Sequence, residues 1–207
     1  MRLSAWDLTI DRGGRRLIAG LSFAADSGAS VIVTGPNGAG KSTLLRALCG
    51  FLPVEAGGFA LEGGDPDRSV GEQAHYLGHS DGVKGALTAG ENLAFAAAML
   101  GGHASREAQV DSLVRVGLAH VIDFPARLLS AGQRRRAALA RLLIAERTLW
   151  LLDEPATALD AGAQGALTTI MQAHLSRGGI IVAAAHAPLG LGGAQEVRLG
   201  ATQGTQA

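Results

Sequence analysis

The chain has 207 residues, a length that favours one domain or one domain with a modest insertion. Its 18 basic and 18 acidic residues give a net charge of zero, which excludes the basic surface of a nucleic-acid-binding protein, and its 30 glycines show no three-residue period, which excludes a collagen-like chain. One cysteine, no signal-peptide pattern and no apolar run long enough to span a bilayer lead us to expect a cytoplasmic protein.

The strands expected in the chain are of two kinds. Two antiparallel strands come first, at residues 3–10 and 21–23, on either side of a turn at Gly13 and Gly14. Three later runs are continuously apolar, at residues 31–33, 149–152 and 180–185. Because these runs do not alternate with polar residues, we expect each to be buried on both faces, as in a parallel sheet covered by helices.

Helices are expected between these strands. Their expected ranges are 41–49, 91–100, 106–116, 131–145 and 161–176. Thr88 with Glu91, and Ser130 with Gln133, match the capping box that begins a helix. We interpret the mainly helical stretch 80–137 as a subdomain inserted into an α/β core of residues 1–79 and 138–199, followed by a frayed tail at 200–207 within a single domain, 1–207.

The strongest chemical motif is a phosphate-binding loop between the strand at 31–33 and the following helix. Its members are Gly35, Pro36, Asn37, Gly38, Ala39, Gly40, Lys41, Ser42 and Thr43. The glycines allow backbone N–H groups to surround phosphate oxygens, and a helix N-terminus adds a favourable dipole. We expect Lys41 to reach the β- and γ-phosphates and Ser42 to supply a hydroxyl ligand to Mg²⁺.

Two carboxylates end the strand at 149–152. Because ligands bind beyond the carboxyl ends of parallel strands, Asp153 and Glu154 should lie near the phosphate loop. Asp153 suits Mg²⁺ binding through water, and Glu154 suits orientation or deprotonation of an attacking water. His186 follows the strand at 180–185 and should lie at the same edge. These features predict a P-loop nucleotide hydrolase.

With these motifs, the chain resembles the ATP-binding subunits of ABC transporters over nearly its whole length. The segment similar to the family's signature is Leu129, Ser130, Ala131, Gly132 and Gln133, with Ala131 in place of the usual glycine. In the family this segment contacts the nucleotide of the opposite subunit, so the resemblance implies Mg²⁺ and ATP as ligands and a homodimer formed on ATP binding. It also implies that Asp160 belongs to the family's D-loop and that His186 contacts the γ-phosphate.

Two positions depart from the family pattern. Arg12 stands where the family has an adenine-stacking aromatic residue; a guanidinium plane can also stack on a base, and a solvated turn arginine is the alternative. His79 stands where the family commonly has glutamine. Imidazole is a poorer Mg²⁺ ligand than an amide oxygen, so we expect His79 to act in coupling rather than in metal binding.

A narrower resemblance comes from residues 76–84, 87–88 and 91–93, which are similar to the CcmA-type ATP-binding subunits of the heme exporter in cytochrome c maturation. It implies coupling of ATP hydrolysis to heme export or delivery. The implied partners are integral membrane subunits of a heme-handling transporter, with this chain peripheral at the cytoplasmic face of the inner membrane. No nucleic acid and no heme bound directly by this chain are expected, and the cargo, heme or a heme–chaperone complex, stays open.

Three alternatives compete with this function. The chain could serve another ABC exporter, or act as a soluble ABC ATPase in repair or translation, although 207 residues leave no room for the coiled-coil insertions usual there. A small-molecule kinase is the third alternative, and the segment 129–133 argues against it because such kinases need no phosphate site on a second subunit.

Several remaining residues receive structural interpretations. Cys49 is expected in the core, and the run of arginines at 134–136 is expected on a solvated or ion-paired helix face. His75, His103, His120 and His174 show no metal-ligand spacing.

Overall fold

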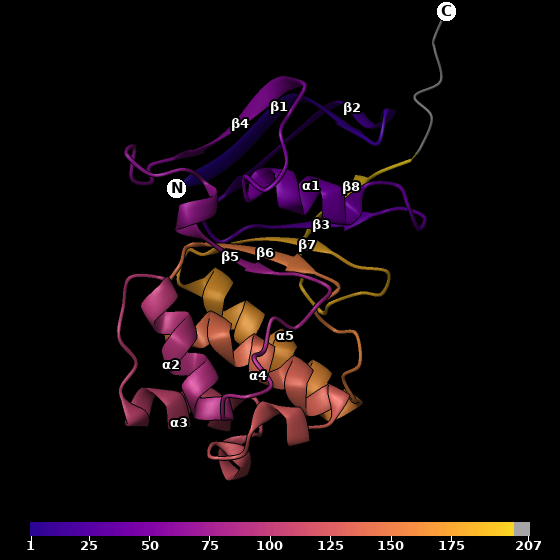
Figure 1. The fold of residues 1–207 in the computed structure, drawn as a ribbon. Coiled ribbons are helices and arrows are strands. Elements are labelled where there is room, and N and C mark those ends of the chain that lie inside the picture. The colour runs from indigo at the N-terminus through magenta and orange to yellow at the C-terminus, as the bar shows by residue number, and fades with distance from the viewer. Residues whose placement is uncertain (201–207) are drawn as a thin grey trace, which may run out of the picture.

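The computed structural model describes residues 1–200, in which an antiparallel sheet, a parallel sheet and a group of helices form successive layers (Figure 1). The antiparallel sheet has the order β2-β1-β4, from strands β1 (Arg2–Arg12), β2 (Arg15–Asp26) and β4 (Ala56–Glu62). The parallel sheet has the order β5-β6-β7-β3-β8, from β3 (Ser30–Thr34), β5 (Ala74–Leu77), β6 (Leu149–Asp153), β7 (Ile180–Ala184) and β8 (Gln195–Arg198). Apart from Gly200, the expected tail lies outside the described residues.

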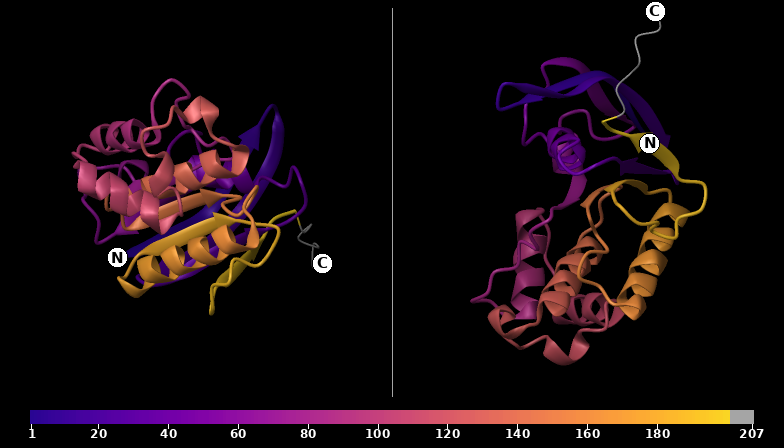
Figure 2. Two further views of the ribbon diagram at one scale, coloured as in Figure 1. Left: turned by 90° about the horizontal axis from the view of Figure 1, so that it is seen from below. Right: turned by 90° about the vertical axis from the view of Figure 1, so that its right-hand side faces the viewer.

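The helices cover both faces of the parallel sheet. Helix α1 (Lys41–Leu48) lies between the two sheets, and the other helices lie on the far side of the parallel sheet (Figures 1 and 2). These are α2 (Ala89–Met99), α3 (Arg106–Arg115), α4 (Ala131–Ile144) and α5 (Ala161–Ser176), with short 3₁₀ turns at Gly71–Gln73, Ala119–Val121 and Ala126–Leu128. Within residues 1–200 no helix has both the length and the apolar character needed to cross a bilayer.

The expected burial of the central strands on both faces is confirmed. Successive residues of a strand point to opposite faces, and in β6 Leu149 and Leu151 pack toward α1 and the antiparallel sheet. Trp150 and Leu152 pack toward α4 and α5. All four are at most 2% exposed, and full burial of each such side chain stabilises the fold by roughly 1.5–3 kcal/mol.

Three strands lacked a recognisable sequence pattern. Strand β4 contains two glycines, which lower strand propensity, and β5 has only four residues. Strand β8, with the sequence Gln-Glu-Val-Arg, is a mostly exposed edge strand whose one buried residue is Val197. Strands β1 and β2 also extend beyond the expected limits, because their pairing continues nearly to the turn. Tertiary pairing, rather than local hydrophobicity, defines these elements.

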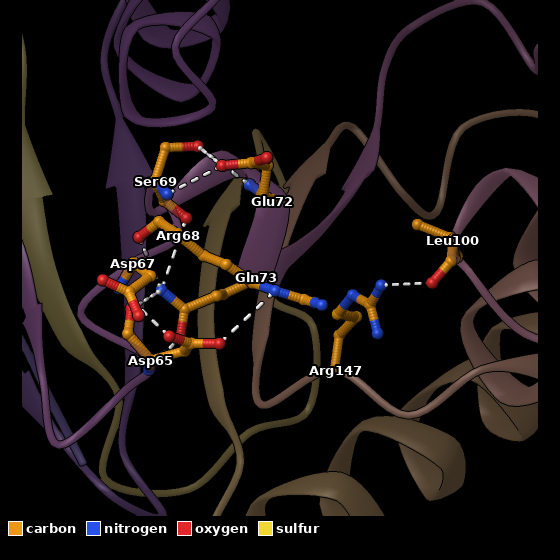
Figure 3. A network of polar contacts seen from close by, with 8 residues as sticks. All are labelled: Asp65, Asp67, Arg68, Ser69, Glu72, Gln73, Leu100 and Arg147. Atoms are coloured by element: carbon orange, nitrogen blue, oxygen red, sulfur yellow. Dashed lines mark hydrogen bonds and ion pairs between the residues drawn. The ribbon is translucent and has the colours of Figure 1, made fainter.

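Side-chain hydrogen bonds organise the loop that leads into β5 (Figure 3). The side-chain amide nitrogen of Gln73 donates to the backbone carbonyls of Asp65 and Arg68, both at 3.0 Å. Its side-chain oxygen accepts from the backbone N–H of Asp65 at 2.7 Å. Nearby, Arg147 donates to the carbonyl of Leu100 at 2.8 Å, which ties the end of α2 to the residues before β6. These contacts hold the start of β5, and the residues after β5, including His79, lie at the carboxyl end of the parallel sheet.

Both expected capping boxes are present. At the start of α2 the Glu91 amide donates to the Thr88 hydroxyl at 3.1 Å, while the Thr88 amide donates to the Glu91 carboxylate at 2.7 Å. Ser130 and Gln133 make the same pair of bonds at the start of α4, at 3.1 and 2.8 Å. Helix α4 continues past residue 137, so the proposed helical subdomain and the core share one helix.

Candidate nucleotide-binding and catalytic site

The phosphate loop joins the end of β3 to the start of α1. Gly35 has a φ of 138°, and a Cβ there would lie 2.5 Å from the carbonyl oxygen of Leu199, so only glycine fits. Gly40 caps α1 with a φ of 105°. These backbone conformations turn the chain sharply, and the N-terminal amides of α1 are directed toward the loop.

Lys41 lies inside this loop. Its side chain is mostly buried, with the residue 7% exposed, and its ammonium donates to the carbonyls of Gly35 at 2.8 Å and Pro36 at 3.2 Å. The cation is therefore held by the first two residues of the phosphate loop.

Ser42 and Asp153 form a hydroxyl–carboxylate pair that suits Mg²⁺. The Ser42 hydroxyl donates to Oδ1 of Asp153 at 3.0 Å, and Asp153 is only 1% exposed. Its other oxygen, Oδ2, is buried without a hydrogen-bond partner among residues 1–200. In the same range no group of three or more His, Cys, Asp or Glu could hold a metal. Because Mg²⁺ commonly uses one or two carboxylates together with substrate phosphates, this pair fits such a site.

Glu154 and His186 face one another across the ends of β6 and β7. Nε2 of His186 lies 3.3 Å from Oε1 of Glu154, with the Glu154 side chain 22% exposed and the His186 side chain 52% exposed. Glu154 has a φ of 50°, in the left-handed region, and its amide donates to the carbonyl of Ala184 at 3.0 Å. This backbone turn carries the carboxylate from the strand end to the cleft.

A cleft of about 460 Å³ gathers most of the predicted residues. Its lining consists of Arg12, Leu17, Asn37, Gly38, Gly40, Lys41, Ser42, Thr43, His79, Glu154, Thr157 and His186. The other predicted members of the loop and strand edge lie within two residues of a lining residue in the chain, and they are Gly35, Pro36, Ala39 and Asp153. A larger hollow of about 590 Å³ lies at the opposite ends of the strands, but it has no phosphate loop.

The signature-like segment lies outside this cleft, together with Asp160. Ser130 and Asp160 are exposed N-cap residues of α4 and α5. The two turns pack closely, because a Cβ on Gly132 would lie 3.2 Å from the carbonyl oxygen of Ala158. The capping box uses the amide of Gln133, so helix geometry leaves the amides of Ala131 and Gly132 as the N–H groups that an external anion could meet.

Arg135 lies deeper than a solvated helix face. Of the two expected alternatives it follows the ion-paired one, with Nη1 3.3 Å from Oδ1 of Asp81, but it is 3% exposed and its other hydrogen bonds reach the ends of β5 and β6. The helix periodicity carried the signal: Arg135 shares its face with Leu139 and Leu142, which are both buried. Leu17 was also missed as a lining residue, since a lone leucine in a hairpin carries no signal for a site.

Of the other singled-out residues, Cys49, His75 and His174 belong to the interior, whereas His103 and His120 are exposed. Cys49 caps the C-terminus of α1 and packs, half-buried, against the core, and burial raises the pKa of its thiol to about 11, which makes it unreactive at neutral pH. His75 and His174 are buried under the sheet, where desolvation lowers the pKa of each to about 4.

Comparison with known proteins identifies the family. A family model described as "ABC transporter" matches residues 18–157, which include the phosphate loop, the signature-like segment and both strand-end carboxylates. The chain belongs to the ABC transporter family. This ABC ATPase is 55% identical to the "Cytochrome c biogenesis ATP-binding export protein CcmA" of Nitrobacter winogradskyi over 97% of this chain and 98% of the relative. A relative with the same description in Nitrobacter hamburgensis is 54% identical, and the match covers 98% of this chain and 100% of the relative's length.

Solved structures confirm the fold of this ABC ATPase. A putative ABC transporter ATP-binding protein from Pyrococcus furiosus superposes with a TM-score of 0.84 at 21% identity, over 96% of this chain and 98% of its own. A bacterial Atm1-family ABC exporter with ATP bound gives a TM-score of 0.81 at 24% identity, over 96% of this chain and 36% of its own. The expected α/β P-loop architecture, with a mainly parallel sheet and an antiparallel part, is therefore confirmed.

Proposed function

We propose that this ABC ATPase is the ATP-hydrolysing subunit of a membrane exporter complex for cytochrome c biogenesis, and that its cargo is heme or a heme complex. One observation carries the catalytic part: a single cleft joins a phosphate loop, a Ser42–Asp153 pair and a Glu154–His186 pair. The resemblance to cytochrome c maturation subunits and the relatives described as cytochrome c biogenesis export proteins support the cargo.

In this proposal the phosphate loop binds the triphosphate of ATP. Lys41 exchanges its two carbonyl acceptors for β- and γ-phosphate oxygens. Ser42 and Asp153 hold Mg²⁺, which when bound neutralises charge on the phosphates. Arg12 and Leu17, on the edge of the cleft formed by the antiparallel sheet, supply a guanidinium plane and an apolar surface for the adenine base.

Glu154 and His186 act on the terminal phosphate. The Glu154 carboxylate, partly shielded from water, accepts a hydrogen bond or proton from the attacking water. His186 lies next to it and donates to a γ-phosphate oxygen, which orients that phosphate against the water. The 3.3 Å separation of the two side chains supports their working on one reacting group.

The signature-like segment serves a second copy of the chain. Ser130 and the free amides of Ala131 and Gly132 form a helix N-terminus outside the cleft of their own chain, which supports their use on the nucleotide of the partner. Asp160 caps the neighbouring helix beside this segment. Two copies arranged head to tail would then enclose two ATP molecules.

The segment between β5 and α2 faces a membrane partner. Lys84 is exposed, with its ammonium 4.6 Å from the centroid of the Phe95 ring, and Met99 follows one turn later on α2. Phe95 and Met99 are 43% and 70% exposed, as at protein-binding surfaces. Buried Asn92 holds the Lys84 backbone through bonds of 2.7 and 3.1 Å. This firmly held cation on an apolar face, close to His79 in the chain, supports docking and coupling at this place.

Glu154→Gln tests the catalytic assignment. The variant should bind Mg²⁺–ATP yet hydrolyse it at least ~10²-fold more slowly, because general-base contributions are typically 10²–10⁴-fold. Since hydrolysis separates the two copies in this proposal, the variant should accumulate as a dimer, which light scattering measures.

The same variant with Mg²⁺–ADP is the control, and it should stay monomeric. A monomer at saturating Mg²⁺–ATP would contradict the dimer, and hydrolysis at the parent rate would contradict the role of Glu154.

A further inference from the structure

The guanidinium of Arg135 is buried where three segments meet. Arg135 lies on α4, five residues after the signature serine, and only 3% of it is exposed. Each of its N–H groups has an acceptor. Nε donates to the carbonyl of Pro155 at 3.4 Å, Nη1 to the carbonyl of Gly78 at 3.0 Å and to Oδ1 of Asp81 at 3.3 Å, and Nη2 to the carbonyls of Asp153 at 3.0 Å and Glu154 at 2.6 Å.

This hydrogen-bond pattern requires arginine. The guanidinium has five N–H donors in a planar fork, whereas the lysine ammonium has three donors on one atom. The acceptors come from the turn after β6 and from the segment after β5, and Asp81 alone among them carries a charge. A buried cation is unfavourable unless its donors are satisfied, so these five bonds hold the two segments against α4.

The bonds of Arg135 act on the backbone that carries Glu154. Glu154 has a φ of 50°, a conformation that non-glycine residues adopt only where their surroundings enforce it. The amide of Glu154 is fixed by the carbonyl of Ala184, and its carbonyl is fixed by Arg135. Both ends of the residue are therefore held, which fixes the backbone position from which its carboxylate reaches His186.

We propose that Arg135 is a positioning residue for ATP hydrolysis, which sets the Glu154 carboxylate in the cleft and joins it to residues 78–81. This inference rests on the proposed role of Glu154. The helix supplies a matched comparison in Arg141, whose guanidinium donates to the carbonyls of Asp81 at 2.8 Å and Gly82 at 3.3 Å. Arg141 thus holds the same segment after β5, but its bonds go to that segment and not to the turn that carries Glu154.

The test compares steady-state ATP hydrolysis by the full chain and its Arg135→Lys, Arg135→Gln, Arg141→Lys and Glu154→Gln variants. Arg135→Lys should lower kcat at least ~10-fold while KM for Mg²⁺–ATP stays within about twofold, because a misdirected carboxylate affects the reacting state and not ground-state binding. Arg135→Gln places no charge at the buried position, so it should show the same lower kcat with unchanged KM even if the lysine variant folds poorly. Arg141→Lys should keep kcat within about threefold of the parent.

Thermal unfolding and binding of a fluorescent ATP analogue establish that each variant is folded and binds nucleotide. An unchanged kcat in folded Arg135→Lys and Arg135→Gln would overturn the proposal, as would an equal loss in Arg141→Lys. Glu154→Gln separates failure of the catalytic role of Glu154 from failure of the positioning role of Arg135. If that variant hydrolyses ATP normally, the role of Glu154 fails. If it is inactive while the Arg135 variants are normal, only the positioning role fails.

Discussion

Two buried histidines flank Trp150 beneath the parallel sheet. The ring of His174 stacks on the indole with centroids 3.8 Å apart and planes 10° from parallel, and the His75 ring meets it edge-on at 6.5 Å. Nε2 of His75 lies 2.7 Å from the carbonyl oxygen of Ala145, and Nε2 of His174 lies 3.0 Å from that of Thr148. Neutral imidazoles satisfy these carbonyls as donors, and desolvation disfavours the charged form, which lowers both pKa values to about 4.

These histidines predict a loss of stability in mild acid. With pKa values near 4 in the folded state and 6.5 in the unfolded state, the unfolded chain binds more protons between those limits. Their contribution is complete above about pH 6.5 and declines as the pH falls toward 4, at up to about 1.4 kcal/mol per pH unit for His75. Urea unfolding at intervals from pH 7.5 to 5 measures it.

In that experiment His75→Gln should make the decline shallower, while His103→Gln, at an exposed position, should leave it unchanged. A free energy of unfolding that is flat from pH 6.5 to 5 would contradict the neutral buried histidines.

Residues of the site differ in how far the sequence predicts them. The phosphate loop is a continuous string, and Asp153, Glu154 and His186 directly follow apolar strands, so local patterns were enough to name them. Arg135 could not be assigned in this way, because its acceptors are backbone carbonyls from two distant turns, and a carbonyl is the same in every residue. Its burial was readable from the helix periodicity, but its partners were not.

At the level of elements, α2 and α4 provide a matched pair of helix starts. Both have a complete capping box, from Thr88 and Glu91 in α2 and from Ser130 and Gln133 in α4. Thr88→Ala and Ser130→Ala should therefore each lower the free energy of unfolding by about 1 kcal/mol, which chemical denaturation measures.

The two variants should differ in catalysis. Since the Ser130 hydroxyl is proposed to serve the nucleotide of the partner, Ser130→Ala should lower ATP hydrolysis several-fold, whereas Thr88→Ala should leave it within about twofold. Equal activities in the two variants would show that Ser130 acts only as a helix cap.

Strands show a parallel contrast in predictability. Strands β6 and β7 are buried along their whole length, and their continuous apolar sequence reports that burial directly. Strand β8 has mostly polar, exposed residues and becomes a strand because β3 offers it a parallel partner from Val31 to Thr34. A short segment stabilised by such remote pairing has no local pattern to read.

For the whole molecule, Lys84→Glu tests how the chain meets a membrane partner. The exposed Lys84 side chain lies over Phe95 on the proposed docking face, and Lys84 is not among the residues that line the nucleotide cleft. The variant should keep the ATP hydrolysis of the isolated chain within about twofold. In cells it should reduce recruitment to membranes and lower covalently bound heme in c-type cytochromes, with b-type cytochromes unchanged, which heme staining of denatured gels measures.

Lys41→Ala is the comparison in those cells, because loss of the loop cation should lower turnover at least ~10²-fold. Normal c-type cytochromes in cells whose sole copy carries Lys41→Ala would remove heme from the proposed function and leave an ATPase of another exporter. Normal recruitment of the Lys84→Glu chain would instead place the docking face elsewhere.

The overall architecture was predictable in kind, and its strand order was not. Apolar runs separated by helices indicate a parallel sheet, two strands around a glycine turn indicate the antiparallel part, and the mainly helical stretch 80–137 indicates the insertion. The order β5-β6-β7-β3-β8 depends on pairings between strands far apart in the chain, which no single segment records.

The strand before the phosphate loop pairs with strands that are synthesised much later than itself. Strand β3 ends at residue 34, yet the two strands beside it, β7 and β8, are the last in the described chain. When a ribosome has joined residue 175, the phosphate-loop sequence already exists, but nothing can pair with β3 on either side. A chain abandoned there through stalling or a premature stop codon therefore lacks a formed nucleotide site.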